Sequence, residues 1–134
     1  MNIPVPTGRQ LLLGGSLTGL LAVMLGAFGA HGLEKIVTPH MLQRFHTGVE
    51  YQFYHALALL ATGLLPQSPG HGAQQRLPGL AGLAFLAGII LFSGSLYLYV
   101  LTGLVAFVLV TPLGGLCFIA GWLLLLLGIY RTPA

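Results

Sequence analysis

Two histidines and a carboxylate lie within residues 46–65, an apolar run long enough to cross a bilayer as a helix. His46, Glu50 and Tyr54 recur every four residues, which places them on one ridge of that helix. His46 and Glu50 could therefore share a proton or supply two ligands to one metal ion. His31 is a candidate third ligand if the preceding connection folds back. Nothing in the spacing requires these groups to meet, so the pattern indicates only a weak metal site.

A structural role is the alternative for the same ridge. Glu50 can pair with Arg44, Lys35 or a histidine near the membrane interface, and so hold this helix against the preceding connection. Proton or ion handling by His46 and Glu50 stays open beside it, because ionisable groups at membrane depth usually face a protein interior or a wet cavity.

Tyr51, His55 and Thr62 form an adjoining ridge of the same helix. A histidine near the middle of the membrane can be a haem axial ligand, a hydrogen-bond partner of a quinone or lipid headgroup, or a proton relay. The sequence therefore gives Glu50, Tyr51 and His55 as candidate ligand-binding residues. Alternatively, His55 stays neutral in the core and bonds to a polar side chain of the third helix, namely Ser93, Ser95 or Tyr97.

The composition places these residues in a membrane protein. The 134 residues are 56% hydrophobic and 5% charged, with a mean hydropathy of +0.92, whereas a soluble domain is about 25% charged. We predict one all-α domain, a transmembrane four-helix bundle, with spans near residues 10–30, 48–65, 77–101 and 112–130. This leaves no room for a soluble catalytic domain and no basic patch for nucleic acid.

Small residues recur at helical spacing in the first and last spans and can bring helix backbones close together. The predicted helix-packing residues are Gly15, Gly19, Gly26, Gly114 and Gly121, with Ser93 and Ser95 of the third span bonding between helices. These contacts can lie inside one bundle or form the seam of a homo-oligomer.

Two Thr-Pro pairs predict helix starts, because threonine can cap a helix and proline is tolerated in its first turn. Thr38-Pro39 begins the second helix and Thr111-Pro112 the fourth. The stretch 103–110 is apolar but too short to span, so it is interfacial, re-entrant or part of a helix. The stretch 67–76 is polar and rich in turn residues, which predicts a solvated loop.

The charges suggest an orientation in the membrane. With four spans, Arg9, Arg76 and Arg131 share one side, while Lys35 and Arg44 lie on the other. The positive-inside rule then places both termini in the cytoplasm.

Four motifs carry a resemblance to a known family: GAFGAHGL (26–33), YQFYHALALL (51–60), LFSGSLYLY (91–99) and TPLGGLCFIAGW (111–122). In this order they resemble the small membrane proteins of the domain-of-unknown-function 423 family, and the match covers nearly the whole chain. The resemblance implies four spans and a location in the bacterial inner membrane. It brings no established activity, cofactor or catalytic residue.

Enzyme chemistry finds little support in the residue types. Ser93-Gly94-Ser95 lacks the frame of a nucleophile elbow, and the lone Cys117 has no base near it in sequence. Glu34 and Glu50 are the only acids. We therefore predict no enzyme activity and no cofactor.

The function predicted from the sequence is that of an accessory or stabilising partner of a larger membrane assembly. The first alternative is a binder of quinone, haem or lipid through His55, Tyr51 and Glu50. The second is an oligomeric conduit for protons or small ions that uses His46 and Glu50.

Overall fold

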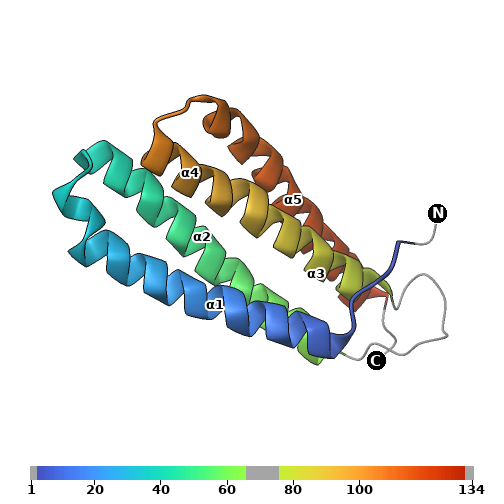
Figure 1. The fold of residues 1–134 in the computed structure, drawn as a ribbon. Helices are drawn as coiled ribbons and strands as arrows, with labels where there is room; N and C mark the ends of the chain where they lie inside the picture. Colours follow the sequence, from blue (N-terminus) through green and yellow to red (C-terminus); the bar gives the residue numbers. More distant parts are fainter. Residues whose placement is uncertain (1–2, 66–75, 132–134) are drawn as a thin grey trace.

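The computed structural model describes residues 3–65 and 76–131, and these residues form a bundle of long antiparallel helices with no strand (Figure 1). The elements in chain order are α1 (Gly8–His31), the 3₁₀ turn η1 (Leu33–Lys35), α2 (Pro39–Leu64), α3 (Leu77–Gly88), the π-helical turn η3 (Ile89–Ser93), α4 (Gly94–Thr102) and α5 (Ala106–Tyr130). The prediction of an all-α membrane bundle is confirmed. The predicted polar loop 67–76 lies outside the described residues except for Arg76.

The first two long helices begin at side-chain caps. Thr7 and Gln10 form a reciprocal capping box at the start of α1. At the start of α2 the Thr38 hydroxyl accepts a hydrogen bond from the backbone N–H of Met41, and Pro39 occupies the first turn. The helix start predicted at Thr38-Pro39 is therefore confirmed.

The third long stretch is one helical rod from Leu77 to Thr102, interrupted by the π-helical turn η3. Figure 1 shows α3 and α4 following one another along the same axis. The rod ends at Gly103, which has a φ of 72° and so adopts the left-handed conformation that favours glycine.

The last helix begins earlier than predicted. Residues 106–110 form the first turns of α5, so Thr111 and Pro112 lie inside the helix and the predicted start at Thr111-Pro112 was wrong. The Thr111 hydroxyl bonds across to Ser95 of α4 at 2.7 Å, which leaves it directed to a neighbouring helix and not to a cap. Membrane helices tolerate an internal proline where neighbouring helices and hydroxyl side chains compensate the freed backbone groups.

Three helical stretches are long and apolar enough to cross a membrane: Gly8–Lys35, Leu77–Thr102 and Ala106–Tyr130. The remaining long helix, α2, has 26 residues but carries more polar side chains, and it does not meet the same standard. Its crossing of the bilayer stays a prediction.

The helices pack as two antiparallel pairs, α1 with α2 and α3 with α5, and α2 and α3 join the pairs. Phe85, Leu11 and Leu59 are fully buried in the larger apolar cluster, and Leu33, Phe45 and Val100 form a second cluster nearer the α1–α2 turn. Large apolar side chains are exposed along α1, α2, α4 and α5, as expected for a surface in contact with lipid.

Glycines set the closest approaches between helices. A Cβ atom added to Gly15 would lie 2.9 Å from the carbonyl oxygen of Ala56, and one added to Gly121 would lie 2.6 Å from the ring of Phe85. At Gly114 the added atom would lie 2.7 Å from the backbone Cα of Phe92. At Gly19 and Gly26 it would make only ordinary contacts, with Ala56 and Val49.

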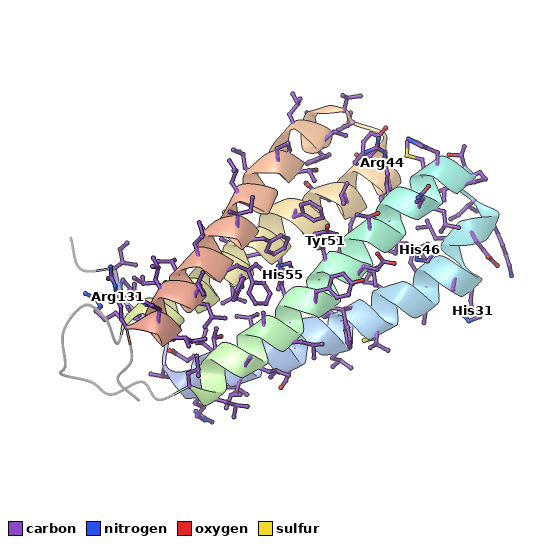
Figure 2. All side chains as sticks on the ribbon, turned by 180° about the vertical axis from the view of Figure 1, so that it is seen from behind. His31, Arg44, His46, Tyr51, His55 and Arg131 are labelled. Atoms are coloured by element: carbon purple, nitrogen blue, oxygen red, sulfur yellow. The ribbon has the colours of Figure 1, made fainter. Side chains whose placement is uncertain are left out.

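The lysine and arginine residues lie toward the two ends of the bundle. Figure 2 shows Arg131 at one end, and His31 and Arg44 toward the other. Arg76 lies at the same end as Arg131 and donates a hydrogen bond to the carbonyl oxygen of Ile3. This separation agrees with the charge pattern used for the predicted orientation; the placement of the termini in the cytoplasm stays a prediction.

Candidate functional site: the His55 cluster

His55 is the most deeply placed titratable group of α2 and is only 4% exposed. Its Nδ1 lies 2.7 Å from the carbonyl oxygen of Tyr51, one turn earlier in the helix. Its Nε2 accepts a hydrogen bond of 3.1 Å from the indole N–H of Trp122 on α5. Figure 2 shows Tyr51 and His55 directed from α2 into the space between the helices.

These two bonds fix the tautomer of His55. An indole nitrogen can only donate, so Nε2 must carry the lone pair. Nδ1 then carries the proton and donates it to the Tyr51 carbonyl oxygen. The imidazole is therefore neutral, and both of its nitrogen atoms have protein partners.

Aromatic rings enclose the imidazole. The Phe118 ring stacks on it with a centroid distance of 3.5 Å and an interplanar angle of 8°. Phe85 and Trp122 approach its other sides at 5.5 and 6.1 Å. We call Tyr51, His55, Phe118 and Trp122 the His55 cluster. Within it, a haem iron or a quinone oxygen could reach Nε2 only by displacing Trp122.

The partners of His55 differ from those predicted. The sequence pointed to Ser93, Ser95 or Tyr97 of the third helix, but the partner is Trp122 of α5. Ser95 instead bonds to Thr111. The sequence did not predict a hydrogen-bond donor from α5. The one available signal was that Trp122 lies well inside its own predicted span.

Gln52 forms a second polar link that sequence reasoning missed. It is 5% exposed, and its amide nitrogen donates to the carbonyl oxygen of Thr18 on α1 at 2.8 Å. Its amide oxygen accepts a 2.8 Å hydrogen bond from the Tyr97 hydroxyl on α4. This amide therefore joins three helices through the interior. The signal was available, since a glutamine three residues before His55 shares its helical face.

Glu50 does not join the His55 cluster. It is exposed and lines a groove of about 330 Å³ between α1 and α2. Glu50 forms no ion pair with any residue among 3–65 and 76–131. The expected pairing with Arg44 or Lys35 is therefore absent. The Arg44 guanidinium instead lies 5.8 Å from the ring centroid of Tyr99 on α4, an arrangement typical of a cation–π contact. The structure thus brings Tyr51 and His55 together and places Glu50 elsewhere.

The residues that the sequence suggested as metal ligands do not lie together. His31 is exposed at the end of α1, while His46 is half-buried on α2, where its ring packs against Gly29 (Figure 2). Within the described ranges no three histidine, cysteine, aspartate or glutamate side chains are placed to hold a metal ion.

Comparison with known proteins shows the family of the chain. Residues 25–115 match the family described as "Protein of unknown function (DUF423)". The chain belongs to this family. The match runs from the end of α1 to the first turns of α5, so it includes Tyr51 and His55 of the His55 cluster but not Phe118 and Trp122.

Its relatives in this family are membrane proteins of similar length. The chain is 45% identical to the UPF0382 membrane protein YwdK of Bacillus subtilis over 87% of this chain and 93% of the relative. It is 40% identical to the UPF0382 inner membrane protein YgdD of Escherichia coli over 93% and 92% of the two chains. No solved structure matches the chain. The predicted family and membrane location are confirmed, and the inner membrane agrees with the name of the Escherichia coli relative.

Proposed function

We propose that this DUF423 protein is a non-catalytic inner-membrane component that stabilises a larger membrane assembly. The observation that carries the proposal is that His55 and Gln52, two buried polar side chains of α2, are both hydrogen-bonded within the chain. Both ring nitrogens of His55 are bonded within the chain, and Gln52 connects α1, α2 and α4. Groups that are engaged in this way hold the bundle together and leave little for a substrate.

The outer surface supports the same function. Large apolar side chains are exposed along α1 and α5, among them Leu20, Val23, Leu123 and Leu126. Helices in a membrane associate through close packing and scattered polar contacts, and such a surface offers both lipid contact and docking faces for other helices. The relatives' names give membrane location and no enzyme activity, which agrees with this proposal.

The proposal is tested by removing the chain from its bacterium and separating the membrane complexes of both strains under native conditions. We expect at least one multi-subunit complex to lose abundance or to shift to smaller size in the deletion strain. Re-expression of the full chain should restore it. Identical complexes in the two strains, over growth conditions in which the protein is made, would refute a stabilising role.

A further inference from the structure

The face between α1 and α2 combines a hollow with a ridge. Small residues of α1, including Gly26 and Ala27, form the floor of the 330 Å³ groove. Phe53 and Tyr54 of α2 line its other side and are 39% and 54% exposed; we call these two side chains the aromatic ridge. A surface that carries small residues on one side and exposed aromatic rings on the other can be complementary to itself across a two-fold axis.

Two polar groups in this groove lack partners. The Glu50 carboxylate and the Tyr54 hydroxyl are exposed, and neither forms a hydrogen bond with any residue among 3–65 and 76–131. Glu50 lies two residues inside the predicted span 48–65, and Tyr54 lies one helical turn further in. Polar groups without a partner are costly inside a bilayer, which α2 is predicted to cross.

We propose that a second copy of this chain docks in the α1–α2 groove to form a two-fold symmetric dimer. The symmetry would place the aromatic ridge of each copy over the hollow at Gly26 and Ala27 of the other. It would also bring the Tyr54 hydroxyl, a donor, toward Glu50 of the other copy, an acceptor. The two residues are one turn apart on α2, about 6 Å along the axis, which two long side chains can span.

The charge and hydrogen-bond pattern favours a second copy over a lipid tail. An acyl chain fills a hollow but offers no donor to Glu50 and no acceptor to Tyr54. A two-fold interface supplies both, and it does so twice. The dimer goes beyond the accessory role, because it concerns the number of copies and holds whichever assembly the chain stabilises.

The first test fills the hollow. Full-length chains labelled at the C-terminus with donor or acceptor dyes are reconstituted in phosphatidylethanolamine and phosphatidylglycerol vesicles, and energy transfer is followed against protein density. We expect the wild type to dimerise. Ala27→Trp should weaken the dimer by about tenfold or more, because a large side chain blocks the groove. Ala120→Trp is the matched control on the exposed side of α5 and should leave dimerisation unchanged.

The second test addresses the polar contact. Glu50→Ala should weaken the dimer by about three- to tenfold, in line with the strength of hydrogen bonds between membrane helices counted twice. Glu50→Gln keeps an acceptor and should retain most of the dimer. Circular dichroism of each variant establishes that the helices are intact.

Three results would overturn the proposal. One is a wild-type chain that stays monomeric at all densities. Another is an equal loss of dimer in Ala27→Trp and Ala120→Trp while both remain helical. The last is a monomer that retains a phospholipid lost on Ala27→Trp, which would assign the groove to lipid.

Discussion

Gly114 offers the sharpest test of the packing between α5 and the π-helical turn. In Gly114→Ala the added Cβ atom would lie 2.7 Å from the Cα atom of Phe92 and closer still to its amide nitrogen. The neighbouring backbone, and not a flexible side chain, must move to admit it. In Gly115→Ala the added atom meets only the Cδ2 atom of the Phe92 ring, at 4.0 Å.

The two variants differ almost only in this contact. Each gains the same helix propensity, about 0.5–1 kcal/mol for alanine over glycine. Gly114→Ala also carries an overpacking cost of about 1–3 kcal/mol. The free energy of unfolding of Gly114→Ala should therefore fall about 1–3 kcal/mol below that of Gly115→Ala, which should equal or exceed the wild type.

The measurement is a reversible titration of the purified chain from mild micelles into sodium dodecyl sulfate, followed by circular dichroism. Gly114→Ala should lose its native signal at a lower detergent fraction than both Gly115→Ala and the wild type. Coincident curves for the two alanine variants would show that α5 does not approach Phe92 as closely as described, and would refute the reasoning.

Three further predictions use the same titration. Trp122→Phe should lower the free energy of unfolding by about 1–3 kcal/mol, because it leaves Nε2 of the buried His55 without a donor; unchanged stability would contradict the assigned hydrogen bond. Tyr97→Phe should cost about 0.6–1.7 kcal/mol through loss of the bond to Gln52, and no change in a Gln52→Leu background would show that the bond is the cause. Gly103→Ala should cost about 1–2 kcal/mol, since its φ of 72° disfavours a side chain; a gain in stability would argue against the left-handed turn.

The helices could be predicted from the sequence where local rules apply. Thr38-Pro39 marks the start of α2 because capping and the fixed φ of proline act within one turn. The same pair at 111–112 also predicted a helix start, but it lies inside α5, and the Thr111 hydroxyl bonds to Ser95 of another helix. A cap and an interhelical bond use the same atom, and only the tertiary arrangement decides between them.

The sequence predicted His55 as the centre of the candidate site, but it did not predict the side chain that bonds to His55. The depth and helical position of His55 singled it out, and it lies in the interior. The rotation of α5 about its axis, which brings Trp122 to His55, depends on packing between segments 67 residues apart. Glu50 and Tyr51 are neighbours in sequence, yet 100° of helical rotation sends them to different faces.

Native mass spectrometry of the protein, released gently from its own membrane, tests most directly the claim that the chain acts by association and not by binding a redox ligand. We expect it to leave the membrane with other protein subunits and without the mass of a haem or quinone. A protein that carries such a mass, and loses it in His55→Ala while its helices survive, would contradict the proposed function.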